Sequence, residues 1–566
     1  MVKTTSKSKE YSAFSQFKLQ TTLAWRKKDL GILYQCIIFV RKPIINTTFR
    51  MSFIGMKFKA AIFCCLLAIL STATAQIKSP KRGIGWDEKT QKLSNAPIDK
   101  LLPGVSWIYT WGETPLGTAD NLGDDDGIMF IPMAWGRNFN ETAIRDYIKS
   151  HSSVKYLLGF NEPNFAAQAN MSPKEAASLW HVLEDIASEF DLRLVAPALN
   201  FSGEKVDGQV WGIYDWIDEF IHSYKEANDR LPKIDCLALH CYMNWYGANT
   251  WFVNEYFYSD IFKDGNDRKY PNIVELLTSV KEATGHYPRM MLTEFCSWEG
   301  DKDGFVTNVD NQIDQMTQRI QKMEQSDMVE GYAWFMANAN ASEYPYMSVF
   351  ETNNANSDLS TLGKVFVNMS GFDLSKYYTP GEIVDAKDYV DATTDEQIVR
   401  LRPNTEPGSD HPLQIQLTAA NPGKGEYSAA TYRIDVPSSG IYTFTLHAKG
   451  DAAMLRIEAP GNDNSAELTI AGQSDVWADY TANITLSAGK NDIKITNLST
   501  NPVLLNSWKF DAGTGIATTT TPGGSYTVYN LQGVKLATFP CESSINLEKG
   551  IYILVSPDGS SRKIAL

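Results

Sequence analysis

The sequence contains few of the residues that build metal centres and disulfide frameworks. Seven cysteines and seven histidines occur among 566 residues, and no Cys or His spacing typical of a metal site is present. Three of the cysteines lie in the first 75 residues, so Cys236, Cys241, Cys296 and Cys541 remain. Four cysteines spread over so long a chain exclude a disulfide-rich scaffold.

Two of these cysteines could still form a bond. Cys236 and Cys241 lie in one expected strand, and their separation of roughly 16 Å excludes a disulfide between them. Cys241 and Cys296 follow strands that we expect to be neighbours, so a disulfide between this pair is geometrically possible. Two buried thiols are the alternative.

Positive charge is scarce outside the N-terminal segment. The chain has a net charge of −14, and the first 75 residues hold 12 Lys and Arg against 2 Asp and Glu, so the remainder carries −24. This acidity argues against nucleic acids and anionic surfaces as partners. Neutral ligands such as sugars remain compatible with it.

The N-terminal segment lacks an apolar run long enough to cross a membrane. Residues 56–70 combine a short basic start with an apolar core, and Ala73-Thr74-Ala75 follows. The run is shorter than the roughly 20 residues of a spanning helix, so a signal peptide cleaved after Ala75 is favoured over a membrane anchor. Met51 or Met56 is then the true start, or the preceding residues are an unusual extension. We expect a secreted or cell-surface protein.

Two stretches place a glutamate at the end of an apolar run. Residues 155–164 end on Asn161-Glu162-Pro163, and residues 289–298 contain Glu294 followed by aromatic residues. Because proline ends a strand, Glu162 should lie at the strand's carboxyl end, where an α/β barrel builds its active site. Either glutamate alone would favour a solvated or salt-bridged side chain. Together they predict a pair that cleaves a glycosidic bond.

The separation of the two carboxyl groups would decide the stereochemistry. About 5 Å between them predicts retention through a covalent intermediate, and roughly 6.5–9.5 Å predicts inversion. Both outcomes require surroundings that push the two pKa values apart.

Repeated strand and helix patterns predict a (β/α)8 barrel over residues 80–372. A capping box at 172–175 starts one helix, others are expected over 216–224, 273–280 and 313–323, and residues 112–127 should form a loop in place of a helix. Eight near-continuous apolar runs suit a buried parallel sheet. They are residues 82–86, 105–111, 128–135, 155–161, 192–199, 234–240, 290–293 and 329–334.

The pattern changes after the barrel. Residues 380–511 alternate between apolar and polar side chains, which predicts an antiparallel β-sandwich. Residues 512–524 are interpreted as a low-complexity linker, and we expect residues 525–566 to form a second, small β-sandwich domain.

Several residues near the expected strand ends could contact a sugar. Asn161 is placed to donate a hydrogen bond to a hydroxyl, or it is a strand-end turn residue. His240 and Tyr242 could orient the second glutamate, although each alone would favour a structural role. Aromatic rings at one barrel rim suggest stacking platforms, with core packing as the alternative for any single ring. These are Trp111, Trp135, Trp298 and Trp334.

Residues 82–370 resemble glycoside hydrolase family 128, a barrel family of clan A. The motifs are Pro132-Met133-Ala134-Trp135-Gly136, Gly159-Phe160-Asn161-Glu162-Pro163-Asn164, Ala238-Leu239-His240-Cys241-Tyr242 and Leu292-Thr293-Glu294-Phe295. The resemblance implies hydrolysis of β-1,3-glucan with retention, with Glu162 as the acid/base and Glu294 as the nucleophile. Cys241 replaces an expected aromatic residue and Asn164 an expected Asp, which bears on subsites rather than on catalysis.

The other two domains also resemble known modules. Residues 382–511 are similar to carbohydrate-binding modules of the family 6/35 type, which implies sugar contacts at Trp477 and Asn506. The resemblance also implies a structural calcium ion, although Lys387 replaces an expected acidic residue; a spacer without sugar binding is the alternative. Residues 528–533 and 549–553 resemble the sorting domain of Bacteroidetes cargo, which implies a partner in the type IX secretion machinery.

The sequence therefore predicts a secreted, modular glycoside hydrolase that acts as a monomer on a polysaccharide and needs no cofactor. One alternative is another clan A activity, such as a β-1,4-glucanase or mannanase. The other is a non-catalytic glycan-binding surface protein. Endo and exo action are both open.

Overall fold

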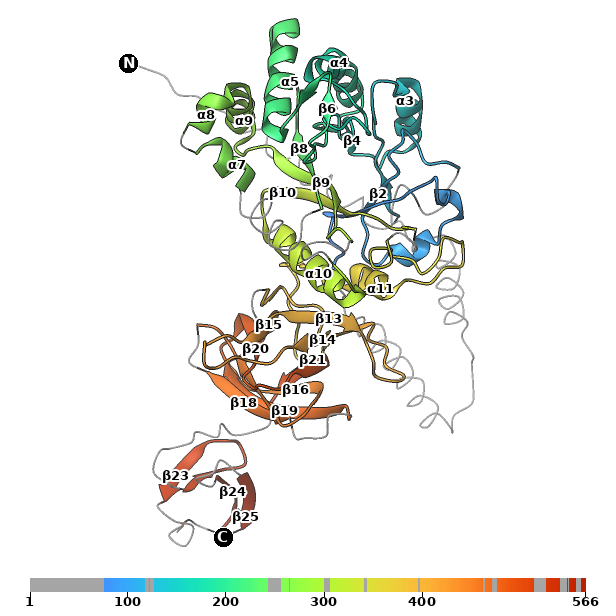
Figure 1. Ribbon diagram of the computed structural model, residues 1–566. Coiled ribbons are helices and arrows are strands. Elements are labelled where there is room, and N and C mark those ends of the chain that lie inside the picture. The colour runs from blue at the N-terminus through green and yellow to red at the C-terminus, as the bar shows by residue number, and fades with distance from the viewer. Residues whose placement is uncertain are drawn as a thin grey trace, which may run out of the picture. The chain divides into compact units, whose positions relative to one another are not determined.

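The computed structural model describes most of the chain after residue 75 (Figure 1). The predicted signal peptide and nearly all of the predicted linker lie outside the described residues. No helix in the described part combines the length and apolar character needed to cross a membrane. The described residues are 76–117, 122, 127–242, 256–263, 265–299, 306–340, 344–394, 397–461, 464–470, 476–513, 526–539, 547, 549–555 and 561–565.

A curled sheet of eight parallel strands forms the centre of the N-terminal domain. Each predicted apolar run overlaps one strand, although Cys236–Cys241 and Arg289–Phe295 extend past the predicted ends of their runs. The spatial order is β3-β2-β1-β10-β9-β8-β5-β4. A parallel bridge between Met133 and Leu158 joins the segment after β3 to β4. The strands are β1 (Arg82–Gly85), β2 (Trp107–Tyr109), β3 (Met129–Phe130), β4 (Tyr156–Leu158), β5 (Arg193–Val195), β8 (Cys236–Cys241), β9 (Arg289–Phe295) and β10 (Val329–Trp334).

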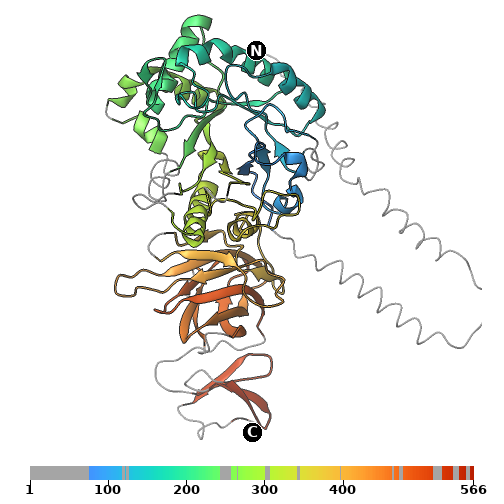
Figure 2. The same cartoon turned by 45° about the vertical axis from the view of Figure 1, so that its right-hand side comes forward.

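Helices lie on the outside of this sheet (Figures 1 and 2). The predicted helix start is confirmed, because Ser172 accepts a hydrogen bond from the Glu175 amide and Pro173 occupies the first turn. The Glu175 carboxylate pairs with Arg137 instead of completing a capping box. The described residues of 112–127 contain no helix, as predicted. The α-helices are α3 (Glu141–Ser150), α4 (Pro173–Glu189), α5 (Ile213–Asn228), α7 (Tyr256–Ile261), α8 (Asn266–Lys269), α9 (Pro271–Thr284), α10 (Val309–Gln325) and α11 (Thr361–Asn368); short 3-10 helices span Leu93–Asn95 and Ile98–Leu101, and β6 (Lys205–Val206) pairs with β7 (Gln209–Val210).

Alternate side chains fill the interior of the curled sheet, as expected for strands with a two-residue period. The Trp107 ring lies over β1, where a Cβ on Gly83 would be 2.1 Å from it. Glycine is therefore required at that position. Cys236, Cys241 and Cys296 are buried thiols, so no disulfide joins Cys241 to Cys296.

Two antiparallel sheets follow, as predicted for residues 380–511. The six-stranded sheet has the order β13-β14-β21-β16-β19, with β11 paired to β21, and the five-stranded sheet has the order β12-β15-β20-β17-β18. The strands are β11 (Ile383–Asp385), β12 (Asp391–Ala392), β13 (Val399–Pro403), β14 (Leu413–Leu417), β15 (Ser428–Val436), β16 (Gly440–Gly450), β17 (Ala453–Glu458), β18 (Ser465–Ile470), β19 (Ala478–Leu486), β20 (Gly489–Asn497) and β21 (Val503–Ala512).

Polar contacts connect this sandwich with α10. Arg402 Nη1 lies 2.7 Å from Asp314 Oδ1, and Gln321 Nε2 donates to Asp391 Oδ1 at 2.9 Å. The described residues of the C-terminal domain form one antiparallel sheet rather than a two-sheet sandwich. Its order is β23-β22-β24-β25, with β22 (Tyr526–Tyr529), β23 (Lys535–Phe539), β24 (Ile551–Val555) and β25 (Ser561–Ala565).

Candidate active site

Glu162 lies just beyond β4, as the apolar run and Pro163 predict. Its amide donates to the Ala198 carbonyl at 2.8 Å, which ties the segment after β4 to the segment after β5. Glu162 has a φ of 44°, in the left-handed region that a glutamate rarely adopts. Backbone strain of this kind concentrates at functional sites. Its side chain is buried.

Glu294 is buried in β9, where two aromatic residues donate hydrogen bonds to it and a third, Tyr109, lies close while donating to the Thr293 carbonyl at 2.8 Å. Trp111 Nε1 donates to Oε1 at 2.6 Å, and the Tyr109 hydroxyl is 3.4 Å from the same oxygen. The Tyr242 hydroxyl donates to Oε2. Donors of this kind stabilise the ionised carboxylate and fix its orientation.

His240 joins the two glutamates. Its Nδ1 lies 2.7 Å from Glu162 Oε1 and 3.2 Å from Glu294 Oε2. One atom of each of the three side chains lies within 4.8 Å of the others. One carboxylate oxygen of Glu162 therefore lies within 4.8 Å of one of Glu294, a proximity compatible with the short carboxyl separation of retaining enzymes.

These three side chains are also the one group of metal-ligand types that the described residues bring together. Their contacts are those of hydrogen-bond partners, because Nδ1 of His240 approaches both carboxylates directly. An ion held in common would need its own space between the ligand atoms. The geometry fits a proton network rather than a metal centre.

The pKa values of the network shift in different directions. Burial raises the pKa of Glu162, but the hydrogen bond and charge of His240 and a bond from Asn200 bring it below its ordinary value. Burial also raises the pKa of Glu294, and with the charge of Glu162 it outweighs the donors, so this pKa lies above its ordinary value. Burial lowers the pKa of His240, but the two carboxylates raise it overall.

The sequence missed two residues that touch the glutamates. Asn200 Nδ2 donates to Glu162 Oε1 at 2.8 Å. Tyr109 approaches Glu294, and its place two residues before Trp111 on one strand face was an available signal. For Asn200 the signal was a polar residue directly after the apolar run 192–199.

The predicted sugar-binding residues divide into two groups. Trp135 is 37% exposed and Trp298 is partly buried against Tyr242, so both can present surface to a ligand. Asn161 lies beside Glu162, and its buried Oδ1 has no hydrogen-bond partner within the described part of the chain. Trp334 is fully buried, with Nε1 bonded to the Met347 carbonyl, so its ring cannot serve as the expected platform.

The outer face of the six-stranded sheet contains a separate pocket of about 400 Å³. His447 lies in it, with Nδ1 2.6 Å from Asp479 and Nε2 2.8 Å from Glu406. The Trp477 ring stacks on the His447 ring with centroids 5.7 Å apart. Asn506 is fully buried and donates to Glu406, so it supports the pocket wall instead of facing a sugar as expected.

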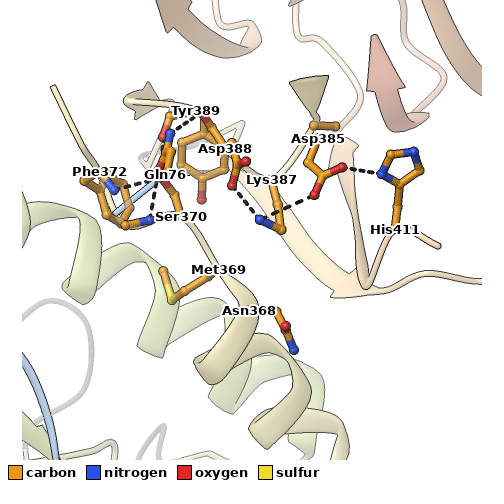
Figure 3. Close-up of polar contacts among 12 residues, drawn as sticks. Gln76, Asn368, Met369, Ser370, Phe372, Asp385, Lys387, Asp388, Tyr389 and His411 are labelled. Atoms are coloured by element: carbon orange, nitrogen blue, oxygen red, sulfur yellow. Dashed lines mark hydrogen bonds and ion pairs between the residues drawn. The ribbon is translucent and has the colours of Figure 1, made fainter. Parts of the chain in front are cut away.

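The residues where a structural calcium was expected do not fit that ion. Lys387 Nζ lies 2.6 Å from Asp388 Oδ1 and 3.6 Å from Asp385 Oδ2, and His411 Nδ1 bonds the other oxygen of Asp385 (Figure 3). Calcium needs six to eight oxygen ligands at roughly 2.3–2.6 Å. Here an ammonium group occupies the space between the two carboxylates.

We therefore expect the melting temperature of the protein to be unchanged by EDTA or by added calcium. Lys387→Met should lower stability by about 2–4 kcal/mol, because it leaves the buried Asp388 carboxylate without its cation. Lys494→Met is the control, since Lys494 pairs with Glu458 only at 3.8 Å on the surface. Thermal unfolding of the full chain measures the effect of the ions and of both substitutions. Stabilisation by calcium would contradict the conclusion that this site does not fit the ion.

The catalytic domain matches a family of known proteins. A family model described as "Glycosyl hydrolase catalytic core" matches residues 83–264 and 266–366, which together make up half of the chain. No curated protein sequence matches the chain.

Solved structures with similarity to the chain include three β-1,3-glucanases. A GH128 subgroup II endo-β-1,3-glucanase from Pseudomonas viridiflava is 27% identical, with 51% of this chain and 98% of that chain covered and a TM-score of 0.39. Its counterpart from Sorangium cellulosum is 28% identical (51% and 97% covered, TM-score 0.36). A curdlan-specific exo-β-1,3-glucanase from Blastomyces gilchristii is 23% identical (45% and 89% covered, TM-score 0.31). On the family match, the chain belongs to the glycosyl hydrolase catalytic core family and is a glycoside hydrolase.

Proposed function

We propose that the chain is a retaining β-1,3-glucanase with Glu294 as the nucleophile and Glu162 as the acid/base. The observation that carries the proposal is the approach of the two buried carboxyl groups within 4.8 Å. The substrate follows from the four family 128 motifs, since Trp135, Glu162, His240 and Glu294 come from these motifs and three of them contact one another. The curled sheet would close into a (β/α)8 barrel through the Met133–Leu158 bridge.

In the first step, a Glu294 oxygen attacks the anomeric carbon while the glycosidic bond breaks and the leaving oxygen takes the Glu162 proton. In the second step, Glu162 removes a proton from water, which attacks the same carbon and releases Glu294. Trp111 and Tyr242 orient Glu294 for attack. Asn161 is placed to bind a neighbouring hydroxyl.

In the site without substrate, the proton shared by the two glutamates does not lie on Glu162, where the first step requires it. Two carboxyl groups this close resist ionising together, and the pKa directions favour the proton on Glu294 over Glu162. Glu294 must be ionised to attack, and the positive charge that develops at the anomeric carbon in the transition state stabilises its anion. The mechanism therefore requires the proton to lie on Glu162 in the reacting substrate complex.

Product analysis tests this function. The mature protein should release oligosaccharides from soluble β-1,3-glucan and not from β-1,4-glucan or mannan, and the first product should have the β configuration. Glu294→Gln should abolish release, because the amide cannot form the glycosyl-enzyme. Activity on β-1,4-glucan or mannan alone would assign the alternative clan A substrate. If the protein cleaves none of the three polysaccharides but still binds glucan, the result would favour a non-catalytic glycan-binding protein.

The sandwich pocket supports a second proposal, that this module binds glycan. Its lining combines carboxylates, imidazoles and hydroxyls beside the Trp477 ring, the mixture of polar groups and aromatic surface that binds sugars. His447→Ala and Trp477→Ala, each in the Glu294→Gln background, should reduce adsorption to insoluble β-1,3-glucan several-fold. Lys494→Met, on the other sheet, should not change it. Equal adsorption by all variants would make the sandwich a spacer.

Export is proposed on sequence features. The basic, apolar and small-residue order of residues 56–75 supports a signal peptide, and the motifs of the C-terminal sheet support sorting through the type IX machinery. Protein recovered outside the cell should begin at Gln76. Removal of residues 525–566 should keep it inside; release that is indifferent to this deletion would overturn the sorting role.

A further inference from the structure

Asn200 is the one neutral amide that contacts Glu162 among the described residues. It follows β5, and backbone bonds fix its segment on both sides: the Glu162 amide donates to Ala198 at 2.8 Å and the His240 amide donates to Leu199 at 2.9 Å. Asn164, fully buried, donates to the Asn200 carbonyl at 2.7 Å. The backbone of Asn200 is therefore held between the ends of β4 and β8.

The side chain of Asn200 has one possible orientation. Its Oδ1 accepts a hydrogen bond from the Phe201 amide at 2.7 Å. The NH2 group must then face Glu162, where Nδ2 is 2.8 Å from Oε1. Unlike His240, whose ring can donate or accept according to its tautomer, an amide nitrogen can only donate.

This donor makes the two oxygens of Glu162 unequal. Oε1 lies 2.8 Å from Asn200 Nδ2 and 2.7 Å from His240 Nδ1. The two carboxylates raise the pKa of His240, which favours a hydrogen on its Nδ1. With that hydrogen in place, a proton on Oε1 would point an O–H group at an N–H group on either side, so the acid form of Glu162 carries its proton on Oε2. Among the described side chains, none forms a hydrogen bond with Oε2 in the free site, which leaves it for the leaving oxygen.

We propose that Asn200 is a positioning residue that holds Oε1 of Glu162 as an acceptor and so directs the catalytic proton to Oε2. The inference rests on the proposed role of Glu162 as the acid/base. Four other titratable groups face Glu162: His240 from β8, Tyr242 directly after it, Glu294 from β9 and Tyr109 from β2. Asn200 differs from them because it cannot change its charge.

The sign of the expected pH effect follows from the hydrogen bond. Burial raises the pKa of Glu162, whereas His240 and then Asn200 lower it by stabilising the anion. Removing the Asn200 donor raises this pKa. The alkaline limb of kcat, which reports loss of the acid's proton in the substrate complex, should therefore move to higher pH.

The experiment compares Asn200→Ala and Asn200→Asp with the unmodified protein on β-1,3-glucan. Asp keeps the acceptor for the Phe201 amide, so it preserves the loop, and it places a carboxylate against Glu162. We expect the alkaline limb to rise by about one pH unit in the Ala variant and further in the Asp variant. Turnover of glucan should fall about tenfold or more, because the proton is no longer directed to Oε2.

A second substrate separates positioning from general damage. A dinitrophenyl β-glycoside of a β-1,3-linked oligosaccharide has a leaving group that needs no proton, so both variants should form the glycosyl-enzyme at nearly the normal rate. Ser202→Ala, in the same loop, is the control and should change neither the pH profile nor the turnover, since within the described part of the chain its hydroxyl bonds only the Glu204 amide.

The outcomes are distinguishable. An unmodified protein that cleaves none of these substrates would refute the proposed function itself. Two results would show that Asn200 only supports the loop in an active protein. Either the alkaline limb stays in place in both variants, or the variants lose as much activity on the dinitrophenyl substrate as on glucan.

Discussion

Two buried glutamates, with one carboxylate oxygen of each within 4.8 Å of the other, determine which side chains must surround them at the mouth of the curled sheet. Each loses hydration, and each destabilises the charge of the other, so both would hold protons without compensating donors. His240 supplies a shared donor between them, and Trp111, Tyr242 and Asn200 supply the rest. Because these donors follow different strands, the site exists only when parallel strands bring their carboxyl ends together.

The sheet makes that assembly possible by keeping its own interior apolar. Trp107 and its neighbours fill the space beneath the glutamates, and glycine on β1 gives the Trp107 ring its room. Glu162 then leaves β4 with a left-handed φ, which turns its side chain toward the other donors. The packing of the core and the strain at Glu162 are two parts of one arrangement, since a rigid support is what holds a strained residue in place.

The sequence predicted the strands and both glutamates because an apolar run indicates a buried strand, and the polar residue that ends the run indicates where the buried strand ends. The sequence could not predict which aromatic rings remain exposed to a ligand. Trp298 and Trp334 both follow or end apolar strands, but the loop carrying Met347 covers Trp334, and strand patterns contain no information about such loops. Asn200 was missed although it has the same signal as Glu162, because its partner lies 38 residues away.

In two places of the chain a nitrogen base lies between two carboxylates, and the two arrangements have different consequences. In the sandwich, Lys387 lies between Asp385 and Asp388, and an ammonium group can only donate hydrogen bonds, so the arrangement is static. In the curled sheet the bridging group is an imidazole, whose proton can move near neutral pH. A cluster that must alternate between acid and base in each catalytic cycle needs the second kind of bridge, because a fixed positive charge would hold both carboxylates ionised.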